Sequence, residues 1–217
     1  YVYNNYNGAD KSAIVTLTPT TDITKKFSFT INQKAEAYAG VTIDARSPFT
    51  TNMKKIVDAN GGVADDIKKV KIIGHSDKYK GCLPKDIPVN VIRIGGNERN
   101  LPHNVYMEWD ASSGTIIVST PGSVVSSGNE CGSMFNKLYG LEEVDLSGFD
   151  ISRCTKMNKM FFDCPKLKHV DLTPLNTSNV TTMFGLFQMC TGLESVNMKG
   201  INTSKVTNMD SMFDRCS

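Results

Sequence analysis

The feature that most constrains this chain is a repeat of 26 residues in its C-terminal part. When the sequence is aligned with itself at that offset, apolar residues fall on apolar residues. The recurring positions are Leu141, Leu167 and Leu193; Val144, Val170 and Val196; Leu146, Leu172 and Met198; Phe161, Phe187 and Phe213; and Cys164, Cys190 and Cys216. One such unit cannot bury its own apolar side chains, so consecutive units must stack on one another.

Each unit has a strand pattern, a polar turn and a second apolar segment. The Leu-x-x-Val-x-Leu pattern is typical of a short strand, and Asn176-Thr177-Ser178 then offers side chains that bond back to the backbone. The apolar residues Met183, Leu186 and Phe187 follow at spacings of three and four, which predict a short helix on the outer side. We therefore expect a β-rich α/β solenoid, a leucine-rich-repeat-type stack of parallel strands that follows a small β-rich N-terminal cap domain.

The first 130 residues show no repeat of comparable quality, but they contain strand patterns between turn signals. These patterns lie at residues 13–18, 27–31, 39–43, 68–74 and 89–95, and a hairpin is expected over 105–118. A short helix is expected over 52–60, where Gly61-Gly62 would end it. The predicted domains are a small β-sheet or sandwich module (1–48), a capping region with degenerate coils (49–130) and the repeats (131–217).

The last repeat carries a family resemblance. The segment from Asn202 to Cys216, together with the strand Leu193–Met198, resembles the repeat of BspA-like leucine-rich-repeat surface proteins of bacteria and some mucosal protists. The resemblance covers roughly residues 131–217. It implies a bacterial cell-surface or secreted protein, with adhesion or contact with a host or matrix as its role. It does not imply a particular ligand.

Composition argues against several other classes of protein. The net charge is +2 and the basic residues are scattered, without the stripe that a nucleic-acid interface needs. No apolar run reaches the ~18 residues of a membrane span, and the N-terminus has no secretory signal pattern. No cluster of cysteines and histidines has metal-ligand spacing, and no constellation indicates a catalytic site or a cofactor. The cysteines at the shared repeat position are expected to be buried and free, and Cys131 and Cys154 align with apolar core positions.

The outward-facing strand positions are the best candidates for a binding site. In successive units they are Glu143 and Asp145, His169 and Asp171, and Ser195 and Asn197. Stacked strands would bring the two aspartates close together, where they would repel each other unless a cation or a basic partner group lay between them. The alternative is a merely solvated face.

The expected function is recognition or adhesion at the cell surface or after secretion. The partner would be a protein or glycan on a host or neighbouring cell, bound through the strand face without catalysis, cofactors, nucleic acid or membrane insertion. The oligomeric state stays open. Because the chain stops at Ser217 within a repeat, the alternative is a structural spacer or stalk that holds a distal domain and has no ligand of its own.

Overall fold

The computed structural model describes residues 11–17, 27–33, 41–43, 48–79, 87–95, 105–121, 125–127 and 129–216. The chain divides into two compact units, Tyr1–Ala39 and Gly40–Ser217. In the first unit, β1 (Lys11–Leu17) and β2 (Phe27–Gln33) form an antiparallel pair. Both strands lie where the sequence pattern predicts them.

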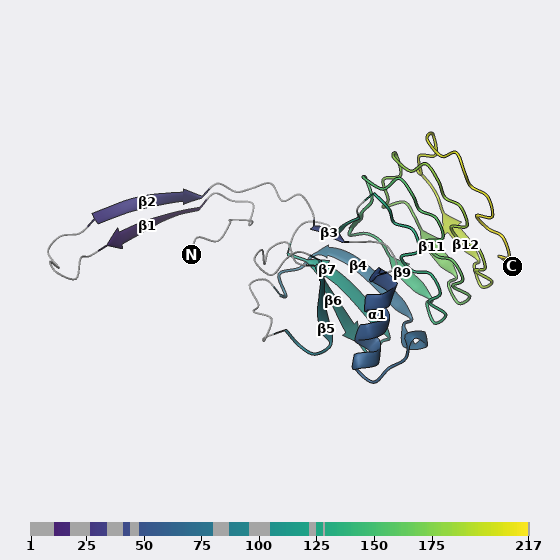
Figure 1. Ribbon diagram of the computed structural model, residues 1–217, viewed down its shortest axis with the longest axis horizontal. Coiled ribbons are helices and arrows are strands. Elements are labelled where there is room, and N and C mark those ends of the chain that lie inside the picture. The colour runs from purple at the N-terminus through teal and green to yellow at the C-terminus, as the bar shows by residue number, and fades with distance from the viewer. Residues whose placement is uncertain are drawn as a thin grey trace. The chain divides into compact units, whose positions relative to one another are not determined.

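The second unit is built on a mixed sheet of five strands (Figure 1). In spatial order these are β5 (Val91–Gly95), β6 (Val105–Asp110), β7 (Thr115–Thr120), β4 (Lys69–His75) and β9 (Glu143–Asp145). Strand β6 pairs antiparallel with both β5 and β7, whereas β4 pairs parallel with both β7 and β9. The predicted hairpin over 105–118 is confirmed as β6 and β7.

One α-helix, α1 (Pro48–Ala59), lies among the described residues and packs against β5 and β6. Its buried face contains Met53, Ile56 and Val57, as the spacing predicts. A short 3-10 helix, η1 (Ala64–Asp66), leads into β4. A small parallel sheet joins β10 (Phe149–Asp150), β8 (Val125–Ser127) and β3 (Val41–Ile43).

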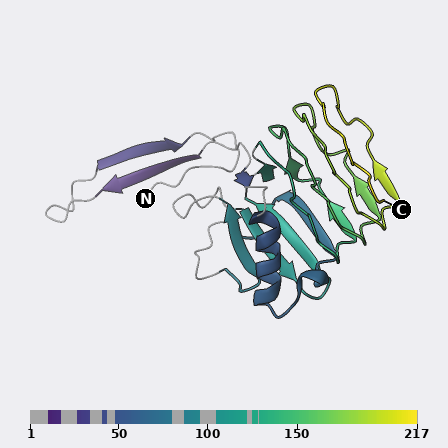
Figure 2. The same cartoon turned by 45° about the vertical axis from the view of Figure 1, so that its right-hand side comes forward.

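The repeat units follow β9 side by side toward the C-terminus (Figures 1 and 2). The strands β11 (His169–Asp171) and β12 (Ser195–Asn197) pair parallel at the repeat offset. Single bridges join Glu130, Lys156, Thr182 and Asn208 on another side of the units. Inside, the rings of Phe135, Phe161, Phe187 and Phe213 stack with centroids 5.2, 5.3 and 5.5 Å apart.

The predicted fold class, a leucine-rich-repeat-type solenoid of parallel strands behind a small cap, is wrong. The largest sheet is mixed, and four of its five strands come from residues 69–120, before the repeats. The repeats add only β9 to it, while β11 and β12 form a separate two-stranded sheet. The physical reason is strand length. Repeat strands of three residues make few ladder hydrogen bonds, whereas strands of five to seven residues before them build the main sheet.

The short helix predicted on the outer side of each unit is also wrong, because a succession of turns occupies that segment. Two equivalent positions in every unit have φ between 55° and 66°, which a right-handed helix does not allow. They are Ser133, Lys159, Gly185 and Ser211, and Lys137, Asp163, Met189 and Arg215. Alternate N–H groups thereby reach the next unit: Phe135 N donates to Met160 O at 2.9 Å and Phe161 N to Leu186 O at 3.0 Å.

Candidate functional site

The six predicted site residues occupy the first and third positions of the three-residue strands β9, β11 and β12. All are exposed except Asp145, which is half-buried. Between them, Val144 and Val170 are buried and Val196 is half-buried. The alternation therefore places two rows of polar side chains on one face. The first row is Glu143, His169 and Ser195, and the second row is Asp145, Asp171 and Asn197.

The first row makes contacts from one unit to the next. His169 Nδ1 lies 2.9 Å from Ser195 Oγ, and His169 Nε2 lies 3.7 Å from Glu194 Oε2. Lys168 Nζ approaches the other oxygen of the same carboxylate at 3.3 Å. This part of the face therefore presents an imidazole, a hydroxyl, an ammonium and a carboxylate to solvent.

Glu143 has a basic partner from outside the repeats. Strand β4 pairs with β9 so that Lys69 is opposite Glu143, and Lys69 Nζ lies 2.7 Å from Glu143 Oε2. The hydrogen bond and then the charge of Glu143 raise the pKa of Lys69 above its usual value. The face is therefore a mixture of both charges rather than the acidic rib that the strand residues alone indicate.

The side chains of the second row accept hydrogen bonds from the backbone of the turns that end the strands. Asp145 Oδ1 accepts from Ser147 N at 2.9 Å, and Asp171 Oδ1 accepts from Thr173 N at 2.9 Å. Asn197 Oδ1 accepts from Lys199 N at 3.3 Å. Short polar side chains that bond the backbone two residues onward form Asx-turns, so the recurrence of this position has a structural cause.

Sequence reasoning missed three members of the face: Lys69, Lys168 and Glu194. Lys168 and Glu194 stand immediately before the outward positions of β11 and β12, and their charge was the available signal. Lys69 had no such signal, because its place beside Glu143 depends on the pairing of β4 with β9, which are 74 positions apart at these two residues.

Two of the cysteines form a disulfide that sequence reasoning did not predict. Cys131 and Cys154 are both buried, as expected of core positions, and are bonded to each other with their Cα atoms 6.2 Å apart. Cys164 and Cys190 are buried and free, which confirms the prediction, whereas Cys216 is free and half-buried. Cys82 lies outside the described residues.

The described parts of the chain contain no group of three histidine, cysteine or acidic residues arranged to hold a metal ion. Within those same parts, every helix is too short or too polar to cross a bilayer. The groups that the exposed strand face offers to solvent are hydrogen-bonding and charged side chains.

Comparison with known proteins places a family match within the repeats. Residues 129–217 match the model of DUF285, described as a Mycoplasma protein of unknown function, which is a BspA-like repeat-associated family. No curated protein and no solved structure matches the chain. The repeat part of this chain is therefore similar to a DUF285 domain.

Proposed function

We propose that this protein is a recognition module of a BspA-like bacterial surface or secreted protein, and that it binds a protein or glycan partner through the strand face. The observation that carries the proposal is the first row, where Glu143, His169 and Ser195 are exposed beside valines that are buried in β9 and β11 and half-buried in β12. The similarity of residues 129–217 to a BspA-like repeat-associated family supports a role in contact with another surface.

The ion pairs of the strand face can be replaced by contacts with a partner. Lys69 and Glu143 are 41% and 50% exposed, and Lys168 and Glu194 are 63% and 56% exposed. Exposed pairs of this kind contribute only ~0–1 kcal/mol to stability. A partner with charged or hydroxyl groups can therefore replace them at small cost, while the buried residues beneath keep their positions.

The proposal is tested by binding to immobilised matrix proteins, mucins and an array of glycans. The variant Glu143→Ala/His169→Ala/Glu194→Ala should weaken a saturable interaction at least about tenfold, which corresponds to ~1.4 kcal/mol. Lys166→Ala is the matched control, because Lys166 is exposed and lies in a turn outside the strands β9, β11 and β12. Its affinity should equal that of the parent.

A second variant separates recognition from folding. Asp145→Ala/Asp171→Ala removes two Asx-turn acceptors, so it should lower the melting temperature as well as any affinity. Unchanged binding in both multiple variants would show that the proposed face is wrong. Folded protein that binds none of the three probe sets would instead favour the spacer or stalk alternative.

A further inference from the structure

The two rows of the strand face continue beyond the repeats onto the main sheet. Strand β4 pairs parallel with β9, so that Lys69 is opposite Glu143 and Lys71 is opposite Asp145. In the other direction, β9 lies next to β11, and β11 pairs parallel with β12. Lys69 therefore extends the first row and Lys71 extends the second row. Each row then has one side chain from each of the strands β4, β9, β11 and β12.

Both rows repeat at a regular distance along the direction in which the units stack. The stacked phenylalanine rings of successive units lie 5.2, 5.3 and 5.5 Å apart, which gives the spacing of the units. Within one strand, the two outward positions are two residues apart, or about 6–7 Å. The middle residue of each repeat strand is a valine on the opposite side of the strand, so only backbone lies between the two rows.

The second row presents carboxylate oxygens that are ordered before any partner binds. Asp145 Oδ1 and Asp171 Oδ1 each accept from a backbone N–H of the following turn at 2.9 Å, and this bond fixes the orientation of the side chain. Among the described residues, Oδ2 of either aspartate makes no hydrogen bond or ion pair. Groups that are already ordered lose less entropy on binding. Two successive units therefore each offer one fixed acceptor to a ligand hydroxyl.

The charges of the face favour a neutral ligand. Lys69 pairs with Glu143, and Lys168 pairs with Glu194, so that opposite charges of neighbouring strands face each other. The half-buried Lys71 is likewise opposite a carboxylate, that of Asp145. Such an alternation produces no field of one sign that would attract a polyanion or a polycation. The rows also contain no Tyr, Trp, Phe or Arg, the residues that usually anchor protein interfaces. Hydrogen bonds to a hydroxyl-rich ligand match these groups best.

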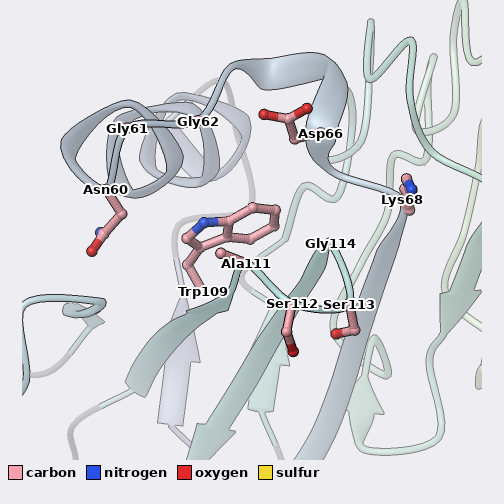
Figure 3. A pocket seen from close by; sticks show the side chains of 10 residues that line it. All are labelled: Asn60, Gly61, Gly62, Asp66, Lys68, Trp109, Ala111, Ser112, Ser113 and Gly114. Carbon is pink, nitrogen blue, oxygen red and sulfur yellow. The ribbon is translucent and has the colours of Figure 1, made fainter.

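The pocket beside the main sheet offers no comparable place for such a ligand. It has a volume of about 280 Å³ and lies between the end of α1 and the β6–β7 turn (Figure 3). Its aromatic side chain, Trp109, is 3% exposed, and the Nε1–H is buried without a hydrogen-bond partner. A ligand in the pocket would reach neither the ring face nor the N–H. The exposed strand face is therefore the surface on which we place the ligand.

We propose that the strand face, extended by Lys69 and Lys71, binds an extended, neutral β-(1→4)-linked polysaccharide that lies along the direction of stacking. Such a chain advances by about one unit spacing per sugar residue, so each unit contacts one residue. Successive residues are related by half a turn, and both edges of each ring carry oxygen atoms. One edge therefore bonds the first row while the other edge donates to the aspartates of the second row. The inference rests on the proposed function and names the class of its partner.

The test measures the binding of tetrasaccharides by calorimetry. Cellotetraose, chitotetraose and mannotetraose are the β-(1→4)-linked probes. Maltotetraose is the matched control, because its α-(1→4) linkages coil the same number of glucose residues as in cellotetraose into a shorter helix. At least one probe should bind at least about tenfold more tightly than maltotetraose. Its affinity should exceed that of the corresponding disaccharide, which spans fewer units, and it should be the same at low and high salt because the ligand is neutral.

The variant Asp145→Asn/Asp171→Asn tests the second row without removing its turns. It replaces the second carboxylate oxygen of each residue but keeps Oδ1 as the turn acceptor, as Asn197 does in the parent. It should keep the melting temperature and bind the probe at least about tenfold more weakly, whereas Lys166→Ala should bind as the parent does. Equal affinity for probes and maltotetraose, or unchanged affinity in the folded double variant, would overturn the proposal. Binding of a matrix protein but of no probe would also overturn it, and the proposed function would stand.

Discussion

At the scale of single residues, the backbone conformation of the repeats depends on positions with positive φ. Seven of the eight recurring positions with φ between 55° and 66° hold residues other than glycine, and Gly185 is the exception. A residue other than glycine in this left-handed region destabilises the fold by ~1–2 kcal/mol. The hydrogen bonds between units offset this cost, because the left-handed residues aim alternate N–H groups at the next unit, as Lys159 N does to Phe184 O at 2.9 Å.

Gly185→Ala should therefore lower the free energy of unfolding by ~1–2 kcal/mol. The φ of +60° causes this loss, since the nearest atoms to an added Cβ are flexible side-chain atoms of Gln188 and Lys159 at 3.2 and 3.3 Å. Guanidinium denaturation measures it. Ser211→Gly, at the equivalent position, is the control and should not lose stability. If Gly185→Ala unfolds like the parent, the left-handed turn is absent in solution.

The recurring cysteine has a hydrogen-bonding role that its apolar neighbours do not reveal. Cys164 Sγ donates to Phe135 O at 3.0 Å, Cys190 Sγ to Phe161 O at 2.9 Å, and Cys216 Sγ to Phe187 O at 3.1 Å. Each thiol thus bonds the phenylalanine carbonyl of the preceding unit. The equivalent position in the first unit, which has no preceding unit, is Leu138.

The Cys164 thiol should make stability depend on alkaline pH. Its contact with Cys190 and then its burial raise the pKa of Cys164 well above the ordinary 9.0. The folded protein therefore holds the thiol proton more tightly than the unfolded chain does. The resulting contribution to stability is complete below the pKa of the unfolded state, and it declines as the pH rises above 9.0. The free energy of unfolding of the parent should therefore fall more steeply above that pH than the free energy of unfolding of Cys164→Ala. Equal slopes for the two proteins would contradict the effect.

At the scale of elements, α1 covers the first repeat in place of a preceding unit. The Phe49 ring meets Phe135 edge-on, with centroids 5.9 Å apart and planes at 89°, so it ends the phenylalanine stack. Thr50 Oγ1 donates to Met134 O at 2.7 Å. In later units the equivalent carbonyl accepts from a phenylalanine N–H, as Leu186 O does from Phe161 N. The helix thus supplies both the ring and the donor that a further unit would supply.

Thr50→Val should lower the free energy of unfolding by ~1–3 kcal/mol, because the buried Met134 carbonyl loses its close donor while the side-chain volume is kept. The measurement is chemical denaturation. Lys55→Ala, at an exposed position of the same helix, should change stability by no more than ~0.5 kcal/mol. Equal stability of the two variants would show that the helix does not cover the first unit in this way.

At the scale of the whole second unit, each repeat stabilises its neighbours, because adjacent repeats pack on one another. Leu172 is fully buried in the middle unit, and Leu172 N donates to Asn197 O of the following unit at 3.0 Å. Leu172→Ala should cost ~2–5 kcal/mol, as for other buried leucines. Met198→Ala, at the equivalent but half-buried position, should cost less.

Thermal unfolding and amide hydrogen exchange measure this coupling. Exchange in Leu172→Ala should quicken in the neighbouring segments 157–164 and 195–198 as well as in the substituted unit, because the units stack on one another. A melting curve equal to that of the parent would refute the assigned register. Faster exchange confined to the substituted strand would refute the coupling between units.

The sequence predicted some elements of the fold correctly, and it predicted the exposure of the site residues but not their contacts. Alternation located strands such as β6 and β7, and the repeat offset matched the bridges from Glu130 to Asn208. The expected solenoid and outer helices were wrong, because apolar spacings of three and four also suit turns whose N–H groups bond the next unit. On the face, alternation predicted exposure but not the Asx-turn role of Asp145 and Asp171, since recurrence does not distinguish a structural bond from a binding contact.

By itself, the sequence determined the period, the buried positions and the polar turns, because these depend on local alternation and on side chains that bond their own backbone. Only the tertiary structure decided that β4 joins β7 to β9, which places Lys69 against Glu143 and makes the main sheet mixed. It also decided that the Trp109 N–H lies buried without a partner beside a pocket. The reason is that the pairing of distant segments depends on how they pack in space. The same local sequence pattern is compatible with several such arrangements.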